Sequence, residues 1–432
     1  MEPSILILLL VFLVLLALNT PIAISISLAT LATMLLTIDS VPALMTVAQR
    51  MMAGFNSFAL LAIPFFILSG YLMGQGGIAR RLIDFALVIV GRLPGGLAFV
   101  NVISCTLFGS ISGSAVAATS AIGGFMIPEM NKAGYNKNFN TAVTVTASTT
   151  GMLIPPSNIL IIYSLASGGV SIAALFIAGY LPGLLVAALL MMVCGVYATR
   201  KGYPTAERIG FNESIGKIVG ALPSLFLIVL VIGGIIKGWF TPTEAGVIAV
   251  VYSLVLSVFV YKEISLKELP AVFAQSAQTT SIVMLLIGAS AAMSWMLSYE
   301  NIPQLLSSAM ITLSDNPILI LLLINLILLL VGTFMDMTPA VLIFTPILLP
   351  VVESLGMSPL HFGIMMILNL SIGLCTPPVG SVLFIGCSVG KTTIGEVLRP
   401  LIPLYCAMFV ALLCVTYISQ ISEWLPRLLG LI

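Results

Sequence analysis

Residues 108–114 read FGSISGS, so three serines and two glycines lie together in one of the most apolar regions of the chain. The 432 residues are 60% hydrophobic and only 7% charged, which excludes a soluble globular protein of ordinary composition. A transmembrane helix needs about 20 predominantly apolar residues, and such runs begin with residues 4–18, 21–38 and 57–74. The sequence therefore predicts an all-α polytopic membrane protein in which residues 108–114 interrupt a membrane segment.

The charged and reactive residues exclude several classes of function. A net charge of +1 gives no reason to expect a nucleic acid partner. The six cysteines have no Cys-x-x-Cys spacing, which favours buried thiols over a disulfide framework or a metal site. His361 is the only histidine, and the stretch GCSVGKT at residues 386–392 is one residue too short for a phosphate-binding loop. We therefore expect no enzyme activity.

Two halves of the chain align at an offset near 222 residues, as from Pro155 to Pro377. The matching pairs are Thr20-Pro21 with Thr241-Pro242, Gly109 with Gly332, Gly134 with Gly356, Gly151 with Gly373, and Pro155-Pro156 with Pro377-Pro378. Chance matches of glycine and proline would not keep a nearly constant offset along so much of the chain. Internal repeats of this kind are typical of secondary transporters.

The distribution of lysine and arginine indicates that the two halves are inverted in the membrane. Residues 76–95 contain three arginines, whereas the matching residues 299–316 contain neither lysine nor arginine. The linker between the halves contains Arg200, Lys201, Arg208 and Lys217. Because cytoplasmic loops carry an excess of basic residues, we expect the arm at 76–95 and the linker to be cytoplasmic and the N-terminus to lie outside. The first apolar run has no basic region before it, so we expect a retained helix and not a signal peptide.

The predicted architecture has about ten transmembrane helices and two re-entrant hairpins. Repeat one covers residues 1–200, with scaffold helices in 1–74, an arm at 76–95, and a transport hairpin and broken helix in 96–168. A cytoplasmic linker follows at 201–218. Repeat two covers residues 219–432, with scaffold helices in 219–298, a transport hairpin and broken helix in 317–390, and a last helix at 399–421.

Four segments at predicted membrane depth contain helix-breaking residues. They are FGSISGS (108–114), TTGMLIPPSN (149–158), GTFMDMTP (332–339) and LCTPPVGS (374–381). Proline removes an N–H and deprives the carbonyl four residues earlier of its partner, and irregular backbone is tolerated in a membrane only where protein or a ligand satisfies it. Carbonyls and hydroxyls suit a small cation, and the N-termini of half-helices suit an anion. The repeat pairs each hairpin tip with a Pro-Pro break, and this arrangement predicts ion or substrate sites. The alternative for FGSISGS is that Gly109 and Gly113 serve close helix packing.

One carboxylate, Asp336, lies within these segments, and a second, Glu244, lies at the start of another predicted helix. Asp336 is the one carboxylate well inside an apolar run, where a charge costs about 2.5–3.5 kcal/mol on insertion scales. We expect a functional carboxylate near the second cation site; the alternative is a cap for the half-helix that begins near Pro339. Glu244, in the stretch TPTEAG, is expected to cap the first turn of a helix.

Several motifs together resemble the large membrane subunit of tripartite ATP-independent periplasmic (TRAP) transporters, over nearly the whole chain. The motifs are GSISGSAVA (109–117), IPPSN (154–158), TPTEAG (241–246), GTFMDMTPAVLIFTPILLPV (332–351) and CTPPVGSVLF (375–384). The resemblance implies a sodium-coupled importer of organic acids, such as C4-dicarboxylates or sialic acid, that works by an elevator movement in a bacterial or archaeal inner membrane. It also implies two partners, a periplasmic substrate-binding protein and a small four-helix membrane subunit.

The resemblance further implies which residues bind the ions and the substrate. The first sodium site is expected to involve Ser110, Ser112, Gly113, Gly151, Ile154 and Pro155. The second is expected to involve Gly332, Thr333, Gly373, Thr376 and Val379, partly through carbonyls. The substrate is expected near Ser114, Ser157, Asn158, Asp336, Thr338 and Ser381. Since these segments contain no arginine, a substrate carboxylate would be bound by hydroxyls, amides, helix N-termini and sodium.

Two other interpretations remain open from the sequence. A stand-alone dicarboxylate or citrate symporter, or an ion antiporter, would share the inverted hairpins but work without a binding protein. A proton-conducting subunit of a membrane enzyme complex would need a chain of intramembrane Lys, Glu or His, and the sequence offers little beyond Asp336.

Overall fold

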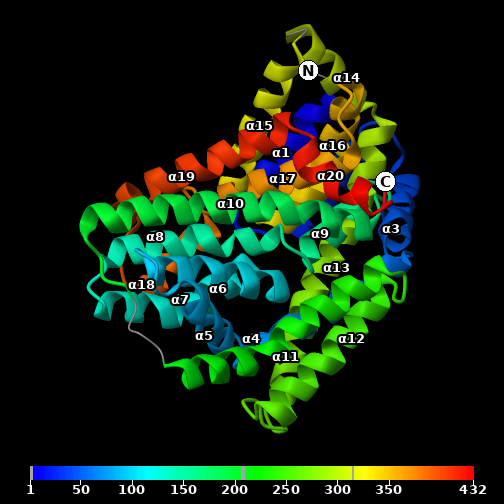
Figure 1. Ribbon diagram of the computed structural model, residues 1–432. Coiled ribbons are helices and arrows are strands. Elements are labelled where there is room, and N and C mark those ends of the chain that lie inside the picture. Colours follow the sequence, from blue (N-terminus) through cyan, green and yellow to red (C-terminus); the bar gives the residue numbers. More distant parts are fainter. Residues whose placement is uncertain (1–2, 206–209, 314–315) are drawn as a thin grey trace.

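The computed structural model describes residues 3–205, 210–313 and 316–432, and within these ranges the chain forms helices and no strand (Figure 1). The first half contains α1 (Pro3–Ala17), α2 (Ile22–Met34), α3 (Ser40–Gly54), the 3-10 turn η1 (Phe58–Leu61), α4 (Ala62–Gln75), α5 (Ile78–Val90), α6 (Gly96–Ser112), α7 (Ala115–Lys132), α8 (Lys137–Ser148), the 3-10 turn η2 (Thr150–Met152), α9 (Asn158–Ala166) and α10 (Ile172–Lys201). The second half contains α11 (Phe211–Ile236), α12 (Pro242–Leu254), the π-helical turn η3 (Val255–Val260), α13 (Leu269–Tyr299), α14 (Ile302–Leu313), α15 (Pro317–Phe334), α16 (Met337–Ser354), α17 (Pro359–Leu374), α18 (Ser381–Gly390), α19 (Ile394–Tyr417) and α20 (Gln420–Leu428).

Eight helices in the described part of the chain are long and apolar enough to cross a membrane. They are Phe58–Gln75, Ile172–Lys201, Phe211–Ile236, Pro242–Val260, Leu269–Tyr299, Pro317–Phe334, Met337–Ser354 and Ile394–Tyr417. Shorter apolar helices include α1, α2, α6, α17 and α18. The predicted all-α polytopic membrane class is thereby confirmed. The ten crossings, the inversion of the halves and the domain limits stay predictions.

The stretch FGSISGS forms the tip of a helical hairpin. Gly113 ends α6 with φ +63°, a left-handed conformation that glycine adopts without steric cost. Ser114 then caps α7, because its Oγ accepts a hydrogen bond from the N–H of Ala117 at 3.2 Å. The second hairpin, α15 and α16, turns at Met335 and Asp336. Local residue chemistry therefore determines where the chain reverses.

The two Pro-Pro pairs interrupt the helical segments that follow the hairpins. α8 ends before Pro155-Pro156 and α9 begins after it, and α17 and α18 flank Pro377-Pro378 in the same way. Both Pro-Pro bonds are cis. Almost all residues of α8 and α17 are buried, so the broken helices lie at the centre of the protein.

Buried amides join these central helices to the hairpins. Asn101 of α6 donates from Nδ2 to Oγ1 of Thr144 on α8 at 2.7 Å. Asn369 of α17 donates from Nδ2 to Oδ1 of Asn325 on α15 at 2.8 Å. A buried amide costs free energy unless it is hydrogen-bonded, so each hairpin is held to the broken helix beside it by a specific polar contact.

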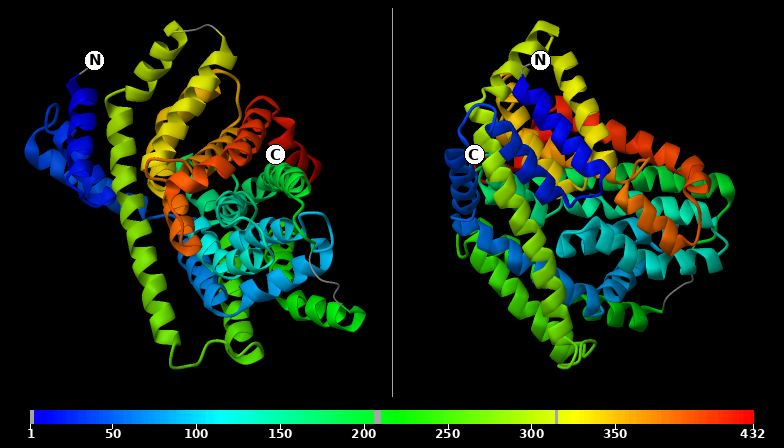
Figure 2. Two further views of the ribbon diagram at one scale, coloured as in Figure 1. Left: turned by 90° about the vertical axis from the view of Figure 1, so that its left-hand side faces the viewer. Right: turned by 180° about the vertical axis from the view of Figure 1, so that it is seen from behind.

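α13 divides the molecule. α2, α3 and α4 pack against it, and α16 of the second hairpin packs against it as well. α1, α2 and α3 lie on one side of this long helix and most of the remaining helices lie on the other (Figure 2, left). The predicted scaffold region 219–298 contains this helix, which begins at Leu269. Its first three turns include polar residues such as Gln275 and Gln278, so hydropathy alone does not mark where it begins.

Several helices were not predicted from the sequence, among them α14, α3 and α20. α3 lies in the gap between the runs at 21–38 and 57–74, and Ala43 is its only buried residue. α20 follows the last predicted span, which ends at Tyr417 and not at residue 421. Both helices carry polar residues at regular intervals, so neither contains a long enough apolar run to be recognised as a membrane segment.

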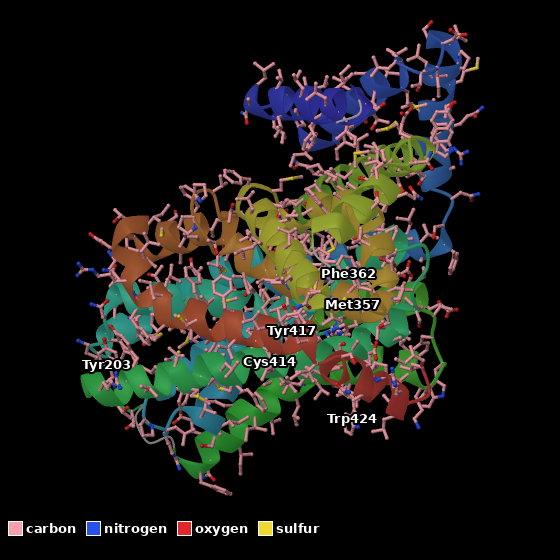
Figure 3. The ribbon with its side chains drawn as sticks, turned by 90° about the horizontal axis from the view of Figure 1, so that it is seen from above. Tyr203, Met357, Phe362, Cys414, Tyr417 and Trp424 are labelled. Carbon is pink, nitrogen blue, oxygen red and sulfur yellow. The ribbon has the colours of Figure 1, made fainter. Side chains whose placement is uncertain are left out.

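α20 buries polar residues and exposes apolar ones. Ser422 and Glu423 are buried, where Ser422 Oγ hydrogen-bonds Nδ1 of His361 and the Glu423 carboxylate accepts a hydrogen bond from Ser358 Oγ. Trp424 is 54% exposed and lies at the edge of the molecule (Figure 3). The single histidine of the chain thus attaches this C-terminal helix to α17.

Glu244 caps α12, as the sequence predicted. Thr241 Oγ1 accepts a hydrogen bond from the N–H of Glu244 at 3.3 Å, and a Glu244 oxygen accepts one from the N–H of Thr241 at 2.8 Å. Thr241→Ala is expected to lower the free energy of unfolding by about 1 kcal/mol, measured by SDS-induced unfolding of the purified protein. Thr393→Ala is the matched control, because Thr393 occupies the same position on α19 without a side-chain cap. Equal losses in the two variants would contradict the capping role.

Candidate functional site

The first hairpin tip lies directly on the first Pro-Pro break. A methyl group added at Gly151 would lie 2.4 Å from Cα of Gly109 and 2.7 Å from the backbone N of Ser110. Such distances leave no room for any side chain at Gly151. Gly109 is thus closely packed on Gly151, and the same contact places Ser110 beside Gly151. Their role in a sodium site stays a prediction.

The second hairpin tip meets the second break in the same manner. A methyl group at Gly373 would lie 2.6 Å from Cα of Gly332. The N–H of Gly380 donates to the carbonyl of Thr333 at 3.1 Å, and a methyl group at Gly380 would lie 2.7 Å from the carbonyl oxygen of Thr376. Four of the five residues expected at the second sodium site thus lie around one backbone contact.

Hydroxyl groups in these segments have lone pairs available. Three of them donate their proton to a carbonyl of the preceding turn, namely Ser110 to Leu107 at 2.8 Å, Thr333 to Leu330 at 2.7 Å and Thr376 to Ile372 at 2.8 Å. A hydroxyl has one donor and two acceptor lone pairs. Each of these oxygens can therefore still accept a hydrogen bond or bind a cation. The hydroxyl of Ser112 makes only a long contact of 3.4 Å with the carbonyl of Ser114.

Three buried polar atoms within three residues after the Pro-Pro pairs have no hydrogen-bond partner among the described residues. They are Ser157 Oγ, Asn158 Oδ1 and Ser381 Oγ. A buried polar group left unpaired costs about 1–3 kcal/mol. A bound ion, substrate or water would satisfy these atoms, and all three belong to the residues expected to bind substrate.

Three other residues expected at the sodium sites could contribute only through backbone carbonyls. Ile154 and Pro155 belong to the first break, and the Ile154 side chain packs on α10, where a methyl group at Gly183 would lie 2.5 Å from its Cγ1. Val379 is 43% exposed, and its side chain carries no polar atom.

A cavity of about 840 Å³ lies between α2, α4 and α13 on one side and both hairpin tips on the other. Of the residues expected to bind substrate, Ser114, Asn158, Asp336 and Thr338 line it. Ser112 and Gly113 of the first tip also line the cavity. Ser157 and Ser381 are not among its lining residues.

Asp336 is exposed to this cavity. It occupies the N-cap position of α16, but its side chain makes no capping hydrogen bond. The side chain of Asp336 therefore does not make the usual capping contact of α16, and its binding to a ligand stays a prediction.

The sequence did not identify the polar residues that the scaffold side contributes to the cavity. Tyr71 and Gln75 on α4 and Thr279 on α13 line it. The Tyr71 hydroxyl lies 2.8 Å from Thr279 Oγ1, and Gln75 Nε2 donates to Gln275 Oε1 at 3.0 Å. On each helix the two polar residues are four positions apart and therefore share one face. This spacing of polar residues in an otherwise apolar helix is the sequence signal that could have identified them.

Residues 9–421 match the family described as "Tripartite ATP-independent periplasmic transporter, DctM component". The chain belongs to this TRAP transporter family. It is therefore the large membrane subunit of a transporter and not an enzyme, and the resemblance found in the sequence is confirmed.

Relatives of the TRAP subunit match nearly its whole length. The chain is 52% identical to an uncharacterized protein, YgiK, of Salmonella typhimurium over 96% of both chains. It is 39% identical to the C4-dicarboxylate TRAP transporter large permease protein DctM of Rhodobacter capsulatus, over 95% of this chain and 96% of the relative. It is 38% identical to the sialic acid TRAP transporter large permease protein SiaM of Vibrio cholerae, over 88% of this chain and 89% of the relative.

The fold of the TRAP subunit is similar to that of a crystallised transporter. The YdaH transporter of Alcanivorax borkumensis superposes with a TM-score of 0.65 over 91% of this chain and 90% of that one, at 14% sequence identity. At this identity the match concerns the fold alone, and it supports the all-helical multi-pass membrane fold.

Proposed function

We propose that this TRAP large subunit imports an organic acid, a C4-dicarboxylate, sialic acid or a similar carboxylate, together with sodium. A periplasmic binding protein delivers the substrate, and a small four-helix subunit accompanies this chain in a bacterial or archaeal inner membrane. The observation that carries the proposal is the cavity, because it lies where the scaffold helices meet both hairpin tips. Substrate binding at such a boundary couples to movement of one part against the other.

Sodium as the co-transported ion is supported by the oxygen atoms at the two breaks. The hydroxyls of Ser110, Thr333 and Thr376 keep acceptor lone pairs, and the Pro-Pro pairs free carbonyls in the preceding turn. Hard oxygen ligands of this kind suit small cations. Each net charge that enters through a potential of 100 mV supplies about 2.3 kcal/mol, so import needs no ATP.

An elevator movement is supported by the way the helices are grouped. The broken helices pack with the two hairpins, whereas α2 and α4 pack on α13. The first hairpin tip approaches α4 closely at Gly70, where a methyl group would lie 2.8 Å from the carbonyl oxygen of Ser112. A rigid-body shift of the hairpins along α4 and α13 would carry the substrate and ions across together.

The proposed topology places the N-terminus outside and the arm and linker in the cytoplasm. Lys217, at the end of the linker, lies 3.3 Å from Asp84 on the arm helix α5. Arg81 of the same arm stacks on Tyr261, 3.6 Å from its ring centre. These contacts support one common side for the basic segments. Arg208 lies outside the described residues.

Uptake is expected to require three components besides this chain, namely the small subunit, the binding protein and an inward sodium gradient. Proteoliposomes with labelled N-acetylneuraminate or succinate and a cognate binding protein measure it, and omitting the binding protein should reduce uptake at least about tenfold. The reason is that, in the proposed function, the binding protein delivers the substrate to the cavity. Replacement of external sodium by choline is the ionic control. Full uptake without the binding protein would instead indicate a stand-alone carrier.

A further inference from the structure

We infer that Tyr405 is a positioning residue for the second sodium site, and that the first site has no counterpart to it. This inference rests on the proposed function, because it takes sodium as the co-transported ion. Tyr405 lies on α19, outside all the segments that the sequence assigned to a site. Its hydroxyl donates a hydrogen bond to the carbonyl of Cys375, directly before the Thr-Pro-Pro stretch of the second break.

The carbonyl of Cys375 lies at the end of α17, where the helix stops before Pro377. The last carbonyls of a helix have no partner within it, and irregular backbone in a membrane must be satisfied by protein or by a ligand. The Tyr405 hydroxyl satisfies this carbonyl. The thiol of the same cysteine donates to the carbonyl of Val145 on α8 at 3.3 Å. The start of the second break is therefore held between α8 and α19.

The next residue, Thr376, supplies the hydroxyl that we expect to bind sodium. This hydroxyl donates to the carbonyl of Ile372, and the Thr376 side chain also interacts with the Tyr405 hydroxyl. A tyrosine hydroxyl has one proton to donate, and Tyr405 gives it to Cys375. The lone pairs of Thr376 thus stay available to a cation, while Tyr405 fixes the backbone beside them. Ligand atoms that are held in place before binding lose less freedom when the ion arrives.

The matching position in repeat one is a glycine. At the offset of the repeat, α19 corresponds to α10 and Tyr405 to Gly183. Cys375 corresponds to Leu153. A methyl group at Gly179, one turn before Gly183, would lie 2.0 Å from the carbonyl oxygen of Leu153. α10 therefore packs glycine backbone against the first break at the place where α19 brings a hydroxyl to the second. The two sites are supported differently, so their sodium affinities should depend on different residues.

Tyr405→Phe tests this inference in proteoliposomes that contain the small subunit and a cognate binding protein. Loss of the hydroxyl is expected to raise the sodium concentration for half-maximal uptake about fivefold, the factor that corresponds to one typical hydrogen bond. Tyr252→Phe is the matched control, because it removes a tyrosine hydroxyl that donates to the carbonyl of Pro223 at 2.9 Å, between α12 and α11. Both variants should lose similar thermal stability, but only Tyr405→Phe should shift sodium activation.

Equal sodium activation in the two variants would overturn the inference while leaving the proposed function intact. A wild-type complex whose uptake does not respond to sodium would instead contradict the proposed function, and the inference with it. If Tyr405→Phe does not fold, replacement of Tyr405 by 4-aminophenylalanine keeps a weaker donor in the same place. This replacement should still raise the half-maximal sodium concentration, whereas the same replacement at Tyr252 should not, and equal behaviour at both positions would overturn the inference.

Double variants assign the effect to one of the two sites. Tyr405→Phe should add little to Thr376→Ala, because the hydroxyl beside the positioned backbone is then already absent. It should add its full effect to Ser110→Ala, because Ser110 belongs to the first break. Equal additions in both backgrounds would mean that Tyr405 does not act through the second site.

Discussion

Substitution of Gly151 by valine is expected to abolish uptake and to lower the free energy of unfolding by about 3 kcal/mol, the upper end for an overpacked core. The backbone of the first hairpin tip occupies the space that a side chain would need, with Cα of Gly109 only 2.4 Å from an added methyl group. Backbone cannot swing aside as a flexible side chain can, so the hairpin must separate from the broken helix. Thermal unfolding of the purified complex and sodium-driven uptake measure the two effects.

A matched control exists on the hairpin itself. Gly124 lies on α7 with nothing within 4 Å of an added methyl group, so Gly124→Val should leave stability and uptake near those of the wild type. Gly373→Val should reproduce the Gly151 defect at the second hairpin, where the same contact occurs. Wild-type stability of Gly151→Val would mean that the tip does not rest on the break.

Ser110→Ala and Thr376→Ala are each expected to raise the sodium concentration for half-maximal uptake about tenfold, without loss of folded protein. Each change removes one oxygen with free lone pairs and leaves the backbone intact. Interactions of a polar group with a charge contribute about 1.5–3 kcal/mol, and 1.4 kcal/mol corresponds to a factor of ten. Uptake measured over a range of sodium concentrations gives the shift.

The control for these variants removes a hydroxyl of the same geometry elsewhere. Ser281 donates to the carbonyl of Ala277 at 2.8 Å on an exposed face of α13, so Ser281→Ala should leave sodium activation unchanged. If Ser110→Ala and Thr376→Ala both behave like this control, the assignment of the sodium sites is wrong.

The features that the sequence predicted well depend on local chemistry. Gly113 and Ser114 specify the first hairpin turn through a left-handed residue and a helix cap, and both Pro-Pro pairs end a helix wherever they occur. Such signals need no knowledge of the partner segment. The two hairpins, the two breaks and the capping role of Glu244 could therefore be predicted.

The features that the sequence missed depend on contacts between distant segments. Glu423 and Ser422 look like a solvated helix face until Ser358 and His361 are placed against them. The polar pair of Tyr71 and Thr279 becomes a cavity wall only when α4 and α13 are adjacent. The periodicity of apolar residues along the sequence describes one helix at a time. It could therefore not show that these residues take part in a buried contact or in the site.

The length of α13 places the cavity at a definite depth. Its 31 residues extend about 46 Å at 1.5 Å per residue, which exceeds the roughly 30 Å of hydrocarbon in a bilayer. The part of α13 that lines the cavity runs from Thr279 to Leu286, which begins about 15 Å from one end of the helix and finishes about 20 Å from the other. If the cavity binds the substrate as proposed and α13 is centred in the bilayer, a substrate there lies near mid-membrane, and a displacement of about 15 Å, half of the hydrocarbon thickness, would bring it to either surface.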